Sequence, residues 1–148
     1  MSQKIEDELR RLSVEIRLLE QTAEALNSRI RMIDALITEL TYTSMTLEGL
    51  EKEGANAELL VPIGGGSYIK AKLETPDKVT LGVGAGVSIE KTLQEAKEII
   101  RKRLEELEKN RSALQQQFSQ VAERIAEDRE RFEELAAELT KEKAQKNV

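Results

Sequence analysis

The chain has 148 residues, a formal net charge of -5, and neither cysteine nor histidine. These absences exclude a thiol nucleophile, a Ser-His-Asp triad and the usual zinc and haem ligand sets. Only four residues are aromatic, so any core must be thin. The composition is rich in Ala, Leu, Glu, Lys and Arg, which is typical of long helices. We predict a chain that is not an enzyme and that uses no cofactor or metal.

The sequence contains no segment typical of membrane targeting. Residues 1–10 are charged, and no run approaches the ~18 apolar residues of a membrane span. The mildly acidic charge balance argues against nonspecific nucleic-acid binding. The lack of cysteine is compatible with a reducing cytoplasm. We therefore expect a cytoplasmic protein whose partners are proteins, with no membrane and no nucleic acid among them.

Residues 1–52 contain a heptad repeat of apolar side chains. Position a is taken by Leu9, Ile16, Ala23, Ile30 and Ile37, and position d by Ile5, Leu12, Leu19, Leu26, Ile33, Leu40 and Leu47. Six heptads in one register predict a long coiled-coil helix. All eight glycines and both prolines lie between residues 49 and 86, so neither flanking arm contains a helix breaker.

Residues 88–143 are predicted to form a second coiled-coil helix, followed by a disordered tail at 144–148. Ser88 is the expected N-cap, with Glu90 in the first turn. The apolar seam of this helix consists of Leu93, Ile100, Leu104, Leu107, Leu114, Phe118, Val121, Ile125, Phe132, Leu135 and Leu139. Two helices this long cannot be enclosed in a globule of 148 residues, so we expect them to pack on one another as antiparallel neighbours.

Three charged residues interrupt the second seam. Lys97, Arg111 and Asp128 either fix the register and choice of partner, or occupy points where the supercoil drifts. Matching Leu47 with Leu93 brings both chain ends to the same tip. The same register places Asp128 within reach of Arg11, and we expect an ion pair between the two helices there.

The middle segment, residues 53–87, changes to a period of two. Short strands are predicted at 58–63, 68–73, 79–83 and 87–89, with glycine-rich turns between them. The fold class is therefore mainly α with a small β insert: a long antiparallel coiled-coil hairpin with two β-hairpins at its inner end. Such small sheets have exposed edges and are marginal alone, so we expect oligomerisation to complete them.

The glycines and paired carboxylates have other possible interpretations, which we disfavour. The segment 64–67 lacks the Gly-Lys-Ser/Thr ending of a phosphate-binding loop, and Gly82, Gly84 and Gly86 lack the dinucleotide spacing. Tight turns explain these glycines. The pairs Glu105-Glu106 and Glu133-Glu134 are better explained as solvated helix faces than as acid/base groups.

The segment LLVPIGGGSYIK at 59–70, followed by LGVGAGV at 81–87, closely resembles the central segment of archaeal-type prefoldin alpha subunits. The helix, two-hairpin, helix layout matches that family over essentially the whole chain. The resemblance implies a hexamer of two alpha and four prefoldin beta subunits, in which the hairpins join a β-barrel platform. It also implies an ATP-independent holdase that captures unfolded polypeptide clients at coiled-coil tips and transfers them to a group II chaperonin.

The predicted register assigns residues to these two roles. Frayed seam residues at the tips would present apolar surface to clients. The client-binding candidates are Ile5, Leu9, Leu12, Phe132, Leu135 and Leu139. The oligomer-interface candidates are Leu60, Val61, Ile63, Tyr68, Ile69, Leu73, Val79, Leu81, Val83 and Val87. Lys141, Lys143 and Lys146 either contribute to chaperonin contact or only aid solubility.

A different class of function also fits the pattern. The chain would then be a structural coiled-coil spacer or a self-assembling oligomer that binds no client, and the hairpins would serve only for assembly.

Overall fold

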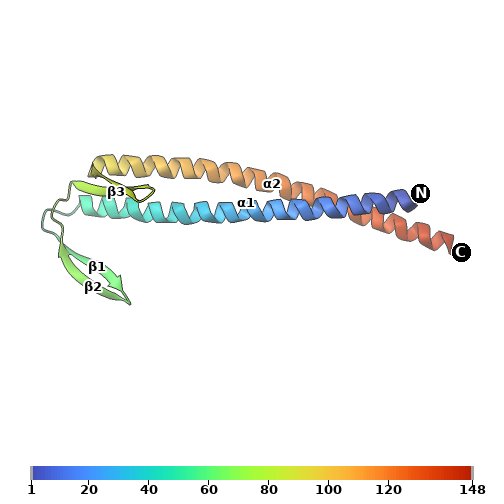
Figure 1. Cartoon of the computed structure of the whole chain (residues 1–148), viewed down its shortest axis with the longest axis horizontal. Helices are drawn as coiled ribbons and strands as arrows, with labels where there is room; N and C mark the ends of the chain where they lie inside the picture. Colours follow the sequence, from blue (N-terminus) through green and yellow to red (C-terminus); the bar gives the residue numbers. More distant parts are fainter. Residues whose placement is uncertain (1, 148) are drawn as a thin grey trace. The chain divides into compact units, whose positions relative to one another are not determined.

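The computed structural model describes residues 2–147 and contains two long helices with four strands between them (Figure 1). Helix α1 spans Ser2–Glu51 and α2 spans Leu93–Lys146. The strands are β1 (Glu58–Gly64), β2 (Ser67–Lys72), β3 (Lys78–Gly84) and β4 (Val87–Thr92). The predicted fold class, two long helices with two β-hairpins between them, is confirmed.

The chain divides into two compact units. The first consists of Met1–Asp34 and Lys109–Val148, and the second of residues 35–108. In the first unit the N-terminal part of α1 lies antiparallel beside the C-terminal part of α2 (Figure 1). Glu8 pairs with Arg131 and Glu15 with Arg124, in agreement with the predicted register. Its apolar cluster is formed by Leu26, Ile30 and Leu114.

In the second unit one hairpin packs against the helix pair. The core consists of Leu47, Leu81, Leu93, Ala96 and Ile100, with Val79 and Ile89 of β3 and β4 packed against it. Ala96 has no exposed surface, so its small side chain lets the hairpin approach α2 closely. Arg103 Nη1 also donates a hydrogen bond to the carbonyl oxygen of Gly82, at 3.1 Å.

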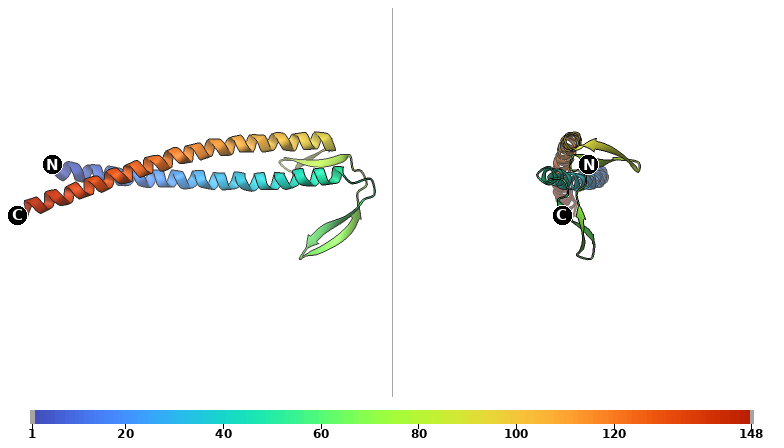
Figure 2. Two further views of the ribbon diagram at one scale, coloured as in Figure 1. Left: turned by 180° about the vertical axis from the view of Figure 1, so that it is seen from behind. Right: turned by 90° about the vertical axis from the view of Figure 1, so that its left-hand side faces the viewer.

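Each hairpin is a separate two-stranded antiparallel sheet, drawn as a separate ribbon in Figure 2. The two share one design. Both shift register just before the turn, between Pro62 and Gly64 and between Gly82 and Gly84. Both turn through two residues with positive φ, Gly65-Gly66 and Ala85-Gly86. Paired positive φ values match the right-handed twist of the flanking strands, which is why glycine dominates these turns.

The second helix begins later than predicted. Ser88 and Glu90 lie in β4, and the helix starts at Leu93. The amide of Glu95 donates to the hydroxyl oxygen of Thr92 at 3.1 Å, so Thr92 is the N-cap. The backbone amide of Leu93 also donates to the carbonyl of Asp77 at 2.9 Å. The prediction that Ser88 caps the helix was therefore wrong, because the alternating pattern from Val87 to Thr92 belongs to strand β4.

The C-terminal end of α2 also differs from the prediction. The helix continues to Lys146, so residues 144–146, which we expected to be disordered, are helical. Val148, at the end of the predicted tail, lies outside the described residues.

The predicted seams agree with the observed burial. Every a and d residue named for the two arms is buried or half-buried. Two of the charged seam residues reach across to α1: Lys97 Nζ lies 2.6 Å from Glu51 Oε2, and Arg111 Nε lies 2.5 Å from Asp34 Oδ1. These contacts favour the interpretation that charged seam residues fix the register. They are less consistent with the alternative, that these residues occupy points where the supercoil drifts.

Candidate functional site

The end of the first unit that holds both chain termini, residues 2–16 of α1 and 124–146 of α2, is called here the open end. It contains all six predicted client-binding residues. Leu12 and Leu135 are buried between the helices. Ile5, Leu9, Phe132 and Leu139 are half-buried, so part of each side chain is exposed. Among the six predicted residues, these four therefore offer the exposed apolar surface. Exposed Val14 and half-buried Ile16 add to it.

A shallow hollow lies beside Phe132 at the open end. The hollow has a volume of about 250 Å³, and Ser13, Ile16, Arg129, Phe132 and Glu133 line it. Ile16 and the Phe132 ring give it an apolar wall, with charged groups at its rim. This arrangement suits a small apolar group.

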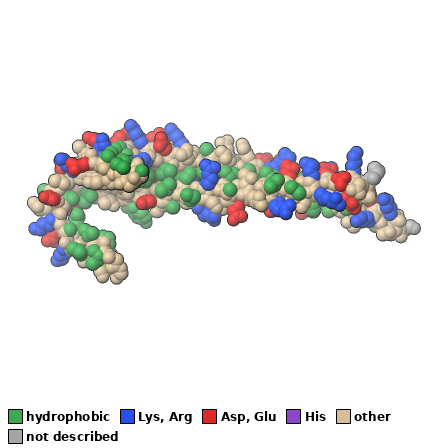
Figure 3. Space-filling model, in the orientation of Figure 1, with side chains coloured by type: hydrophobic (Ala, Val, Ile, Leu, Met, Phe, Trp, Pro, Cys, Tyr) green, Lys and Arg blue, Asp and Glu red, His purple; other side chains and the backbone are tan. Residues whose placement is uncertain are grey.

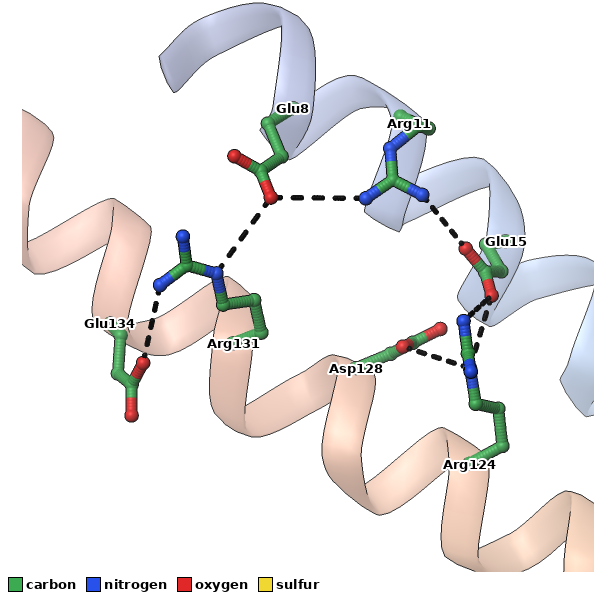
Figure 4. A network of polar contacts seen from close by, with 7 residues as sticks. All are labelled: Glu8, Arg11, Glu15, Arg124, Asp128, Arg131 and Glu134. Carbon is green, nitrogen blue, oxygen red and sulfur yellow. Dashed lines mark hydrogen bonds and ion pairs between the residues drawn. The ribbon is translucent and has the colours of Figure 1, made fainter.

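Charged side chains connect the two helices at the open end (Figure 4). Arg124 donates two hydrogen bonds to Oε1 of Glu15, from Nε at 3.2 Å and from Nη2 at 2.9 Å. These bonds raise the pKa of the Arg124 guanidinium above its ordinary value. Arg131 contacts Glu8 across the interface and Glu134 on its own helix. Because these groups are largely exposed, they align the helices more than they stabilise them.

The expected ion pair between Arg11 and Asp128 does not form. Arg11 instead contacts Glu8 and Glu15 on its own helix, and Asp128 contacts Arg124 one turn away at 3.4 Å. The prediction was wrong because each residue has a nearer partner of opposite charge at i±3 or i±4. Asp128 is buried, and its Oδ2 has no hydrogen-bond partner. A buried carboxylate oxygen without a partner weakens the seam locally.

The predicted oligomer-interface residues divide between the two hairpins. Seven of the ten are exposed: Leu60, Val61, Ile63, Tyr68, Ile69, Val83 and Val87. Leu73 and Val79 are half-buried. Leu81 is buried in the core of its own unit, so the folded chain leaves little of it for a partner.

One face of the β1–β2 hairpin is apolar, with Val61 and Ile69 exposed and Leu59 and Ala71 half-buried. Leu59 pairs with Ala71 and Val61 with Ile69, so these four side chains share a face. The equivalent face of β3–β4, with Val79, Leu81 and Ile89, packs on the helices. Figure 3 shows hydrophobic side chains gathered on the surface of the β1–β2 hairpin. The same pattern is thus covered in one hairpin and exposed in the other.

Helix α1 also carries exposed apolar residues that the heptad pattern did not identify. In the second unit, the exposed apolar residues of α1 outside the seam are Leu36, Tyr42 and Met45. In the first unit they are Val14, Leu18 and Met32. Their spacings of 4 and 14 residues fit one side of a helix, and a search for a second stripe would have found them.

The described residues contain no cluster of three or more acidic side chains placed to hold a metal ion. Within residues 2–147, no helix is long and apolar enough to cross a membrane.

The model of the family described as "Prefoldin subunit" matches residues 19–138. The chain belongs to the prefoldin family. The match covers parts of both helices and all four strands. It includes residues 124–138 of the open end, and residues 2–16 lie outside it. Membership of this family makes the chain a chaperone subunit.

Individual prefoldins resemble the chain over most of its length. It is 36% identical to prefoldin subunit alpha of Methanococcoides burtonii, over 85% of this chain and 91% of the relative. It is 38% identical to prefoldin subunit alpha of Methanopyrus kandleri, over 78% of this chain and 74% of the relative. A chain of filamentous prefoldin from Methanocaldococcus jannaschii, solved by cryo-EM, matches with a TM-score of 0.68 and 29% identity, covering 78% of this chain and 95% of that chain.

Proposed function

We propose that the chain is a subunit of a cytoplasmic, ATP-independent holdase that captures unfolded polypeptides at the open end of its helix pair. Membership of the prefoldin family, together with half-buried apolar side chains at the open end, carries this proposal. A client gains burial of its own apolar side chains against Ile5, Leu9, Phe132 and Leu139. Each contact is weak, and several subunits acting together raise the overall affinity.

The exposed apolar face of β1–β2 supports a role in assembly. We propose that this hairpin joins strands of prefoldin beta subunits in a barrel-like platform, in a hexamer of two alpha and four beta subunits. The face formed by Leu59, Val61, Ile69 and Ala71 needs a cover that its own helices do not supply. The captured client would then pass to a group II chaperonin, with Lys141, Lys143 and Lys146 as candidate contacts.

A refolding assay tests client capture. The wild-type chain and a chain lacking residues 1–12 and 132–148 are each mixed with a beta-class partner and an aggregating client, without ATP. We expect the truncated chain to assemble normally and to lose suppression of client aggregation. The proposal is wrong if the truncated assembly protects the client as well as the full chain does.

Point variants sharpen this test. Serine at Ile5, Leu9 and Leu139 removes half-buried apolar surface from the open end. The matched control places serine at Gln3, Asp7 and Glu138, which are exposed on the same two segments. We expect only the first set to lower protection of the client.

A second candidate function is self-assembly without client binding. The similarity to filamentous prefoldin favours this alternative, because that protein forms filaments. Native mass measurement after mixing with a beta-class partner separates the two. A filament or homo-oligomer as the sole stable form, without protection of a client, supports the structural role.

A further inference from the structure

Helix α1 carries a second apolar stripe, which we call the outer stripe: Val14, Leu18, Ala25 and Met32. The exposed fractions are 46% for Val14, 57% for Leu18 and 68% for Met32, and Ala25 is exposed as well. Successive steps of four, seven and seven residues keep these side chains on one side of an α-helix. At about 100° per residue this side is nearly opposite the buried seam. All four residues belong to the first unit.

The other helix has no such stripe. No large hydrophobic side chain is exposed in α2 over the described residues 93–146. Both helices use their seam to pack on each other, so coiled-coil pairing does not account for apolar residues on the outside of α1. Side chains as large as Leu18 and Met32 are unfavourable in water, and their alignment along about 27 Å of helix indicates a binding surface.

Positive charges flank the outer stripe. Arg10 and Arg17 lie along one edge and Arg11 and Arg29 along the other, as helical spacing places them. Arg11 is paired with Glu8 and Glu15. Over residues 2–147, Arg10, Arg17 and Arg29 are exposed and form no ion pair. The chain as a whole is acidic, so the arginines along the two edges of the outer stripe have the opposite sign to the net charge.

These charges decide which partner fits. A second copy of α1 would bring arginines against arginines, and α2 of a second copy has no exposed large apolar side chain to fill the stripe. An acidic amphipathic helix satisfies both features. We propose that the outer stripe binds a partner protein's helix of about five turns, whose carboxylates flank its apolar side chains and pair with Arg10, Arg17 and Arg29. This inference does not depend on client capture at the open end.

Binding of synthetic peptides to the full chain tests the proposal. Two labelled peptides of about 20 residues carry leucine at alternating steps of four and three, with glutamate at the flanking positions in one and lysine in the other. We expect fluorescence anisotropy to detect binding of the acidic peptide and not of the basic one. The double variant Leu18→Gln/Met32→Gln should bind the acidic peptide about tenfold more weakly.

Charge reversal supplies a second arm. The double variant Arg17→Glu/Arg29→Glu should prefer the basic peptide, because the flanks of the stripe then carry the opposite sign. Lys102→Glu, an exposed reversal on α2, should leave acidic-peptide binding unchanged. Circular dichroism checks that each variant keeps its helical content.

Three outcomes overturn the proposal. The first is equal binding of both peptides, or binding of neither. The second is that Leu18→Gln/Met32→Gln dissociates a homo-oligomer in sedimentation experiments, which assigns the stripe to a second copy. The third is that this variant loses protection of an unfolded client while acidic-peptide binding is unchanged, which assigns the stripe to clients.

Discussion

Leu81 and Val61 occupy equivalent positions in the two β-hairpins, yet 6% of Leu81 and 44% of Val61 is exposed. Leu81 pairs across the sheet with Ile89, and Val61 pairs with Ile69. The first pair contacts the helices of its own chain, and the second pair is exposed. One strand pattern therefore serves two purposes, an internal core and an external surface.

This difference predicts that substitutions at the two positions affect different properties, folding stability at Leu81 and assembly at Val61. Leu81→Ala should destabilise the second unit by about 2–5 kcal/mol, because it leaves a cavity in a packed core. Val61→Glu should leave the stability of the isolated chain nearly unchanged and should prevent assembly with beta-class subunits, because it places a charge on the uncovered face. Urea unfolding and size-exclusion chromatography with light scattering measure the two effects. Normal assembly of the Val61→Glu chain would contradict the role given to β1–β2.

The buried carboxylate in the seam predicts a stabilising substitution. Asp128 is 5% exposed, and its Oδ2 lacks a hydrogen-bond partner. Asp128→Leu should raise the free energy of unfolding by about 1–3 kcal/mol, because an apolar side chain replaces a poorly satisfied charge. Arg124 keeps its contact with Glu15 in this variant. Glu127→Leu at the exposed neighbouring position is the control, and equal gains in thermal stability from both variants would argue against the seam as the cause.

The start of α2 predicts which hydroxyl group caps the helix. Thr92→Ala should lower stability by about 1 kcal/mol, because the amide of Glu95 loses its acceptor. Ser88→Ala should have a much smaller effect, because Ser88 is exposed within β4. Thermal unfolding of both variants measures the two losses of stability. A larger loss for Ser88→Ala than for Thr92→Ala would show that Thr92 is not the N-cap.

The contact between Glu51 and Lys97 predicts a pH dependence of stability. The hydrogen bond from Lys97 lowers the pKa of Glu51 below its ordinary value of 4.5. A carboxyl group with a lowered pKa in the folded state contributes stability above pH 4.5 that is lost as the pH falls through the folded pKa. The melting temperature should therefore decrease as the pH is lowered from 4.5. Glu51→Gln should make this decrease smaller, because glutamine does not titrate.

The control for this titration is Glu53→Gln, at an exposed position just beyond α1. It should retain the pH dependence of the wild-type chain. An identical dependence in wild type and Glu51→Gln would show that Glu51 does not contribute.

Much of the candidate site could be predicted from local patterns. The heptads located both seams, including the half-buried residues of the open end, because a helix places residues three and four apart on one face. The glycine turns located both hairpins, since positive φ is a local requirement. The actual partners of Arg11 and Asp128 could not be predicted in this way, because the choice among several oppositely charged neighbours depends on side-chain distances.

The two helices, the two hairpins and the buried side of each helix could be predicted from local patterns, because they follow from side-chain period and backbone preference over a few residues. Local patterns did not show that β3–β4 packs on the helices while Val61 and Ile69 on the matching face of β1–β2 stay exposed; this depends on the three-dimensional packing. The two hairpins have nearly the same alternation, so the pattern does not distinguish them. Contacts between residues distant in the chain, such as Leu47 with Leu81 and Ile100, make that distinction.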